Sequence, residues 1–117
     1  MTVAVVGSRT WTDAEAVWRG LAACRGRGPV RIITGDCPTG VDALVGALED
    51  VRVYVADWLS YGKSAGPRRN ARLVADADIV LAFRMPGRSP GTDDVIRQAL
   101  RARKELHVYY GQTEDRP

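Results

Sequence analysis

Four short segments of the sequence combine glycine with hydroxyl, guanidinium or carboxamide side chains. They cover residues 7–9, 35–42, 66–70 and 87–92. Glycine allows a backbone to come close to a ligand, and hydroxyl and guanidinium groups donate hydrogen bonds to anions. No segment reads GxGxxG or GxxxxGK[ST], so the ordinary dinucleotide and nucleoside triphosphate fingerprints are absent. The residue types still favour binding of an anion such as phosphate.

The residues expected to contact the ligand come from all four segments. They are Gly7, Ser8, Arg9, Gly35, Gly40, Asp42, Gly66, Arg69, Asn70, Gly87, Ser89, Gly91 and Thr92. Two of them have a second interpretation. Arg9 can equally be a solvated side chain. Asp42 can bind a ribose or amine hydrogen, but its position alone favours a carboxylate that stabilises the positive end of a helix dipole.

Basic residues crowd the start of the helix that Pro67 is expected to open. Arg68, Arg69 and Arg72 fall in its first two turns, where the helix dipole disfavours positive charge. This cost favours an anionic partner, and we assign the anion to Arg69. For Arg72 we expect a solvated position and an ion pair with Asp76 four residues later.

The segment at 87–92 leads into the last predicted helix. Glycines and small hydroxyl side chains before a helix N-terminus resemble a phosphate cradle. Asp93 and Asp94 bring negative charge into the first helical turn. They either cap the helix or face away from a bound phosphate.

Strand and helix patterns alternate along the chain. Strands are predicted at 3–6, 30–34, 51–55, 79–83 and 106–110, in short runs rich in β-branched or aromatic residues. The first helix is expected to begin at Thr12, with Glu15 completing a capping box. The side chains expected to face the core from the helices are Ala14, Val17, Trp18, Leu21, Ala22, Ala43, Leu44, Ala47, Leu48, Val95, Ile96, Ala99 and Leu100.

Strict alternation predicts an α/β fold: a three-layer α/β/α Rossmann-like domain with a five-stranded parallel sheet, over residues 1–110. Residues 111–117 are expected to form a frayed tail. All four anion-binding segments lie between a strand and the next helix. In an open parallel sheet that edge holds the ligand, at the point where the strand order reverses.

Composition sets the remaining expectations. The 117 residues fit one domain and contain no apolar run long enough for a membrane span, so no membrane partner is expected. The N-terminus lacks the pattern of a signal peptide, and we expect a cytoplasmic protein with Cys24 and Cys37 as free thiols.

Two cysteines and one histidine predict no metal site. A net charge of +3 is weak evidence for nucleic acid. Trp58 can stack on a base or pack at a hinge.

Several motifs together carry a family resemblance. They are Gly7-x-Arg9 with Trp11, Gly35-x4-Gly40-x-Asp42, Asp57-Trp58, Gly62-Lys63-x-Ala65-Gly66-Pro67-x-Arg69-Asn70 and Gly91-Thr92. This set resembles the YspA/cpYpsA-like branch of the SLOG superfamily, named after the Smf/DprA and LOG proteins. The resemblance implies a Rossmann-like fold, a pocket for a nucleotide or nucleotide-derived ligand, and self-association into a homo-oligomer.

The LOG relatives are phosphoribohydrolases with a Pro-Gly-Gly-x-Gly-Thr-x-x-Glu motif, whose Glu serves the chemistry. In this chain Val95 occupies the Glu position, and the motif is one residue longer. Asp94 is one residue away and would point about 100° from that direction on a helix. This departure argues against LOG-type hydrolysis.

Three functions follow as hypotheses. The first is a binding module or sensor for a nucleotide-like small molecule, with Mg²⁺ accompanying a phosphate ligand as an option. The second is N-glycosidic hydrolysis of a nucleotide, for which Asp36, Asp42 and Asp94 are the available acids or bases. The third is single-stranded DNA binding, by analogy with DprA. Arg97, Arg101 and Arg103 lie on the last helix, but no aromatic residues are interleaved with them.

Overall fold

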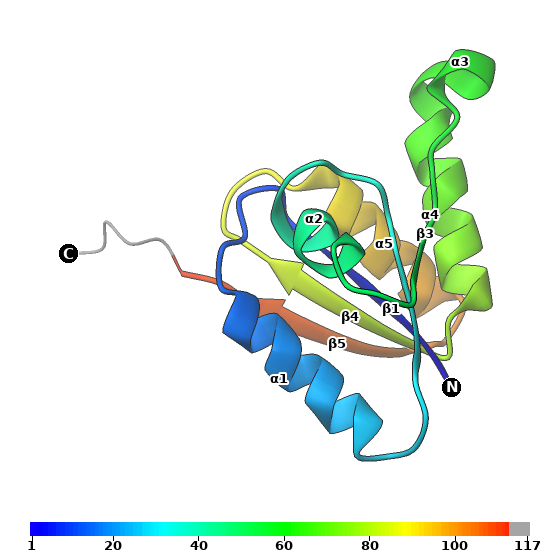
Figure 1. Ribbon diagram of the computed structural model, residues 1–117. Helices are drawn as coiled ribbons and strands as arrows, with labels where there is room; N and C mark the ends of the chain where they lie inside the picture. The colour runs from blue at the N-terminus through cyan, green and yellow to red at the C-terminus, as the bar shows by residue number, and fades with distance from the viewer. Residues whose placement is uncertain (113–117) are drawn as a thin grey trace.

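The computed structural model describes residues 1–112, in which five strands form one parallel sheet (Figure 1). The strands are β1 (Thr2–Gly7), β2 (Arg31–Thr34), β3 (Val51–Val53), β4 (Ile79–Arg84) and β5 (Glu105–Tyr110). Their order is β3-β2-β1-β4-β5, and every neighbouring pair is parallel. The predicted three-layer Rossmann-like fold is therefore confirmed. The predicted frayed tail lies outside the described residues from position 113 onward.

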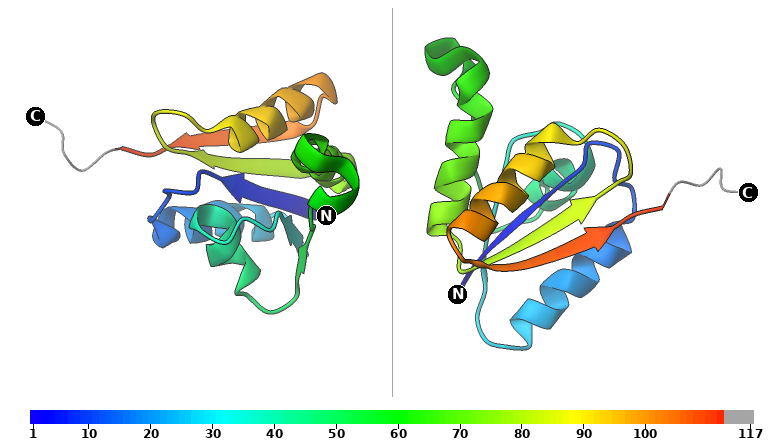
Figure 2. Two further views of the ribbon diagram at one scale, coloured as in Figure 1. Left: turned by 90° about the horizontal axis from the view of Figure 1, so that it is seen from above. Right: turned by 180° about the vertical axis from the view of Figure 1, so that it is seen from behind.

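Helices cover both faces of the sheet (Figure 2). They are α1 (Ala14–Arg25), α2 (Gly40–Gly46), α3 (Trp58–Tyr61), the 3-10 turn η1 (Gly62–Ser64), α4 (Ala65–Asp76) and α5 (Pro90–Arg101). Helices α1 and α2 pack on one face, and α4 and α5 pack on the other. No helix within residues 1–112 is long and apolar enough to cross a membrane.

Strand β1 shows why the sheet needs cover on both sides. Val3 and Val5 join the core under α1 and α2, whereas Ala4 and Val6 join the core under α4 and α5. Successive side chains of a strand point to opposite faces, so a run of four buried residues fills two cores at once. The run 79–83 of β4 is buried in the same way.

The strand order reverses between β1 and β4, which are neighbours in the sheet although their first aligned pair, Val3 and Ile79, is 76 positions apart in sequence. From β1 the chain winds toward β3 on one side, and it then returns to β4 and β5 on the other. The loops after β1 and β4 diverge at this point and leave a crevice at the carboxyl edge.

The predicted start of α1 was one residue early. Asp13 is the N-cap, and its carboxylate accepts a hydrogen bond from the Ala16 backbone, so the expected Thr12–Glu15 capping box is wrong. Trp18 is 37% exposed, and Ala22 is also exposed. Gly20 and Cys24 are buried beside Val17 and Leu21 instead.

Further predictions, about which helix residues are buried and where a strand ends, were also wrong. Helix α2 ends at Gly46 and buries Val41 and Val45, while Ala43 and Ala47 are exposed. Leu100 was expected inside but is 62% exposed. Strand β3 ends at Val53 rather than at residue 55.

The segment between β3 and α4 was expected to be a loop, but it contains α3 and η1. Helix α4 begins at Ala65, so Pro67 lies within its first turn instead of opening it. The expected ion pair between Arg72 and Asp76 does not form. Arg72 donates to the Val55 carbonyl at 2.9 Å, and Asp76 accepts from the Tyr54 hydroxyl at 2.5 Å.

Candidate functional site

A cavity of about 430 Å³ opens at the carboxyl edge of the sheet, where β1 and β4 diverge. Ten of the thirteen predicted ligand residues line it: Gly7, Ser8, Arg9, Gly35, Asp42, Arg69, Asn70, Ser89, Gly91 and Thr92. They come from four separate segments, which the topology brings to one edge. The volume lies in the range of small-molecule sites.

Three buried hydroxyl groups form a chain across the cavity wall. The Met85 backbone N–H donates to Ser8 Oγ at 2.9 Å, Ser8 Oγ lies 2.8 Å from Ser89 Oγ, and Ser89 donates to Thr92 Oγ1 at 3.2 Å. Each hydroxyl has one proton, so Ser8 must donate to Ser89 if Ser89 donates to Thr92. The Thr92 proton then has no acceptor among residues 1–112, and it remains available in the first turn of α5.

Asp42 lies on another wall of the cavity and is 9% exposed. Its carboxylate accepts from the Cys37 backbone N–H at 3.1 Å and from the Thr34 hydroxyl at 3.4 Å. Burial raises the pKa of Asp42 above its ordinary value, although these hydrogen bonds and the charge of Arg69 act in the opposite direction. The Asp42 carboxyl group therefore faces the cavity in either protonation state.

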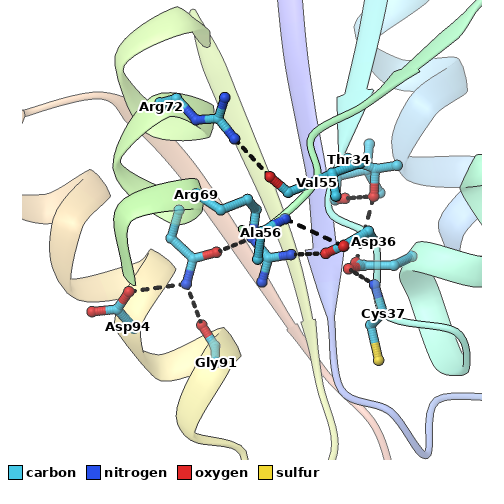
Figure 3. A network of polar contacts seen from close by, with 12 residues as sticks. Thr34, Asp36, Cys37, Val55, Ala56, Arg69, Arg72, Gly91 and Asp94 are labelled. Carbon is cyan, nitrogen blue, oxygen red and sulfur yellow. Dashed lines mark hydrogen bonds and ion pairs between the residues drawn. The ribbon is translucent and has the colours of Figure 1, made fainter. Parts of the chain in front are cut away.

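Arg69 joins the two sides of the crevice (Figure 3). Its Nη1 forms an ion pair with Asp36, which follows β2, and its Nε donates to Asn70 Oδ1 at 2.9 Å. Asn70 Nδ2 in turn donates to Asp94 Oδ2 on α5 at 2.9 Å. The pair with Asp36 compensates the arginine charge, which lies in the second turn of α4, within the two turns that the sequence predicted.

Gly35 is required for this arrangement. A Cβ atom at Gly35 would lie 2.6 Å from Asp42 Oδ2 and 3.1 Å from Arg69 Nη1. Only a residue without a side chain lets the carboxylate and the guanidinium approach from both sides. Gly7 has a comparable role, since a Cβ there would lie 2.4 Å from the Phe83 carbonyl oxygen.

The two acidic residues at the start of α5 point to different partners. Asp93 pairs with Arg84 through two hydrogen bonds of 2.6 and 3.0 Å, and this contact lowers the pKa of Asp93. Asp94 accepts from Asn70 and from Gln98. Neither carboxylate lines the cavity, so the alternative in which they face away from the ligand fits the structure.

Val95 is buried at 2% exposure and lines the cavity. An isopropyl group there supplies an apolar wall and no acid or base. Residues 1–112 contain no cluster of three His, Cys, Asp or Glu side chains that could hold a metal ion.

The site can now be set beside known proteins. The Gene 61 protein of Mycobacterium phage D29 is 35% identical to this chain over 112 residues, covering 86% of this chain and 89% of the phage protein. This chain belongs to the Gene 61 protein family. No family model matches the sequence, and no solved structure matches it. The name Gene 61 protein states no activity, so the geometry of the site carries the functional argument.

In this member of the Gene 61 protein family, three predicted ligand glycines lie outside the cavity lining. Gly40 has φ +73°, and a Cβ there would lie 2.1 Å from the Ser8 carbonyl oxygen. Gly66 packs against the Trp58 ring, and the Gly87 carbonyl accepts from Arg84. Their roles in this structure are therefore in shaping loops and in packing.

Several cavity residues were not predicted from the sequence. Cys37, expected only as a free thiol, lines the cavity together with Thr10, Met85, Pro86, Arg88 and Pro90 and the apolar Val6, Leu73 and Val95. Arg88 had a usable signal, since it lies between predicted residues Gly87 and Ser89. Nothing in the sequence distinguishes the apolar lining residues from core residues, because both follow the same hydrophobic pattern.

Proposed function

We propose that this protein binds a nucleotide or nucleotide-derived ligand in the cavity at the carboxyl edge of the sheet, as a binding module or sensor. The observation that carries the proposal is the directed hydroxyl chain from Ser8 through Ser89 to Thr92. It leaves a free proton on Thr92 in the first turn of α5, where a helix dipole favours anions. A phosphate, which only accepts hydrogen bonds when fully ionised, fits this donor.

The charges around the cavity support the same ligand. Arg9 and Arg88 line it as exposed side chains, and they form no ion pair among residues 1–112. Asp42 lies on a different wall and keeps lone pairs for the hydroxyl groups of a ribose. Asn70 uses its amide on Arg69 and Asp94, so we assign it a positioning role.

We also propose that the protein is a YspA-like member of the SLOG superfamily. The resemblance implies a ligand at the carboxyl edge of the strands, and the position of the cavity at that edge supports the proposal. On this proposal, replacement of the LOG glutamate by Val95 suits a protein that retains its ligand instead of hydrolysing it.

The test is a thermal-shift and calorimetric screen with nucleoside mono-, di- and triphosphates, NAD and ADP-ribose, each with and without Mg²⁺. A ligand at about 100 times its Kd should stabilise the fold by about 2.7 kcal/mol. Thr92→Val should abolish most of the shift, whereas Thr12→Val, at an exposed position outside the cavity, should leave it intact. Absence of any shift across the panel, or an equal shift in Thr92→Val, would refute the proposal.

A second candidate, N-glycosidic hydrolysis, rests on Asp42. A buried carboxyl with a raised pKa that faces a cavity is a typical general acid. On this hypothesis Asp42 would protonate the departing base while water attacks the ribose. Chromatography should then show free base, which Asp42→Asn abolishes; calorimetry on the same variant separates this loss from any weaker binding of the ribose. Asp94→Asn is the matched control, since Asp94 does not line the cavity. Ligand bound but unchanged over hours would exclude hydrolysis.

A further inference from the structure

Helix α3 and the start of α4 form an arm that projects beyond the sheet (Figures 1 and 2). None of the residues of α3 is buried, and Trp58 and Tyr61 are 56% and 49% exposed. The Trp58 ring lies against the backbone of α4 at Gly66, where a Cβ would be only 3.3 Å from the ring. The arm therefore holds two aromatic rings in place and leaves about half of each in solvent.

Arginine side chains lie over aromatic rings along the same arm. The Arg68 guanidinium is 4.3 Å from the centre of the Tyr61 ring. Arg72, one helical turn further along α4, is 5.6 Å from the centre of the Tyr54 ring, and Arg52 on β3 is 5.1 Å from it. Because residues four apart share a helix face, Arg68 and Arg72 connect these contacts into one row of three arginines and two tyrosines. We call Arg52, Tyr54, Trp58, Tyr61, Arg68 and Arg72 the aromatic–arginine surface. Its exposed rings are those of Trp58 and Tyr61, whereas Tyr54 is buried and supports the two arginines from below.

The positive charge of this surface is not neutralised. Arg52, Arg68 and Arg72 form no ion pair within residues 1–112, nor does neighbouring Lys63. The nearby carboxylates are already used. Asp57 caps α3 by accepting from the Ser60 backbone at 3.1 Å, and Asp76 accepts from the Tyr54 hydroxyl. The geometry thus combines exposed rings with uncompensated cations.

We propose that the aromatic–arginine surface binds single-stranded nucleic acid, independently of the nucleotide cavity. Exposed rings stack on unpaired bases, which a duplex hides, and guanidinium groups hold phosphates along the backbone. An arginine already held over a ring keeps its charge and N–H donors for a phosphate. A second copy of the chain fits less well, since a two-fold contact would oppose the cations of both copies.

The experiment uses the full chain with fluorescein-labelled dT12 and measures anisotropy from 50 to 300 mM NaCl. Trp58→Ala and Tyr61→Ala should each weaken binding about tenfold, since one base loses its stacking partner. Trp18→Ala is the matched control, because Trp18 is an exposed tryptophan on α1, away from the arm, and it should not change the affinity. Trp58→Phe should restore most of the loss and show that stacking is responsible.

The arginines are tested through the salt dependence. Arg52→Ala/Arg68→Ala should reduce the slope of log K against log[salt] by about 1.4, because each phosphate contact on a single strand contributes about 0.7. Arg101→Ala on α5 is the control, at an exposed position outside the surface. Circular dichroism and melting curves of every variant establish that it is folded.

Three outcomes would overturn the proposal. The first is no binding of dT12 or its RNA counterpart at 50 mM salt. The second is equal binding of a duplex or heparin that the aromatic variants leave unchanged, which would indicate general polyanion binding. The third is a concentration-dependent dimer that Trp58→Ala dissociates and dT12 does not, which would assign the surface to a second copy. Thr92→Val should bind dT12 normally, so failure of the cavity proposal is distinguishable.

Discussion

The Ser8 and Ser89 hydroxyl oxygens lie 2.8 Å apart, although 81 positions separate the two residues in sequence. Ser8 follows β1 and Ser89 is the N-cap of α5, so their contact spans the crevice where the strand order reverses. The Ser89 side chain makes no capping hydrogen bond to the α5 backbone and donates to the Thr92 side-chain oxygen Oγ1 instead. A single hydrogen-bonded chain therefore ties β1 to α5 and sets which proton faces the cavity.

Ser89→Ala should affect both stability and binding. The Ser8 proton loses its acceptor and Thr92 loses its donor, so we expect a loss of about 1–2 kcal/mol in the free energy of unfolding. Nucleotide affinity should fall about tenfold, because the Thr92 hydroxyl is then free to turn away. Urea denaturation and calorimetry measure the two effects, with Thr12→Ala as the exposed control. Unchanged stability would show that Ser8 and Ser89 do not act together.

Gly40, outside the cavity lining, and Gly91, within it, should respond in opposite ways to alanine. Gly40 has φ +73°, and its Cβ would lie 2.1 Å from a backbone oxygen, so Gly40→Ala should cost about 2–4 kcal/mol. Gly91 lies on α5 with nothing within 4 Å of a Cβ, so Gly91→Ala should be neutral or stabilising by up to about 1 kcal/mol. The new methyl enters the cavity lining and should weaken nucleotide binding. Urea denaturation combined with calorimetry separates the two cases, and equal destabilisation would contradict this account.

The fold was predictable because its signals are local. Runs such as residues 3–6 and 79–83 are buried on both sides, as their continuous apolar pattern indicated. The strand edge that holds the cavity followed from topology alone. The ion pairs and hydrogen bonds between residues of the site could not be predicted in the same way. Asp36 neutralises Arg69 from 33 residues away, and no spacing rule relates the loop after β2 to a position on α4.

Helix faces were the weakest part of the sequence prediction. Trp18 and Leu100 are hydrophobic at nearly correct helical spacing, yet both are exposed, while Gly20 faces Phe83 at a distance of 3.2 Å from its would-be Cβ. The side of a helix that meets the sheet depends on how closely the backbones pack. Here a glycine allows the close approach and rotates the buried face of α1 away from Trp18.

Substitutions at the start of α1 test which residue caps this helix. Asp13 accepts from the Ala16 backbone N–H at 3.1 Å, whereas the sequence favoured Thr12. Asp13→Ala should therefore reduce the free energy of unfolding by about 1 kcal/mol. Thr12→Ala should change it by less than about 0.5 kcal/mol. Urea denaturation of both variants decides between the two caps, and a larger loss for Thr12→Ala would restore the capping-box prediction.

Arg69→Ala should raise the pKa of Asp42 further, because the arginine charge is one of the interactions that lower it. The folded state holds the Asp42 proton more tightly than the unfolded chain does. Stability therefore falls as pH rises from the ordinary carboxyl value of 3.8 through the raised pKa. This fall should be larger in Arg69→Ala. Carboxyl NMR titration gives the pKa directly, and Arg88→Ala, which lines the cavity but is not among the charges that act on Asp42, is the control.

Glu105 on β5 should produce a pH dependence of the opposite sign. Its carboxylate accepts from Arg27 at 2.6 and 3.1 Å and lies 2.8 Å from His107 Nε2, and these contacts lower its pKa from 4.5 to about 2. The resulting stability is fully present above pH 4.5 and is lost as pH falls through about 2. Glu105→Gln should remove this part of the acid sensitivity. The effect should shrink in 1 M NaCl, because the groups are exposed and salt screens them.

The measurement for Glu105 is the urea midpoint of the wild-type chain and Glu105→Gln between pH 2 and 6. The difference between them should be constant above pH 5 and should decrease steadily toward pH 2. Glu49→Gln provides the matched control, since Glu49 is exposed and forms no ion pair within residues 1–112. Parallel curves for the wild type and Glu105→Gln over this range would mean that solvent screening removes the interaction. The link between the end of α1 and the edge strand β5 would then contribute nothing to acid stability.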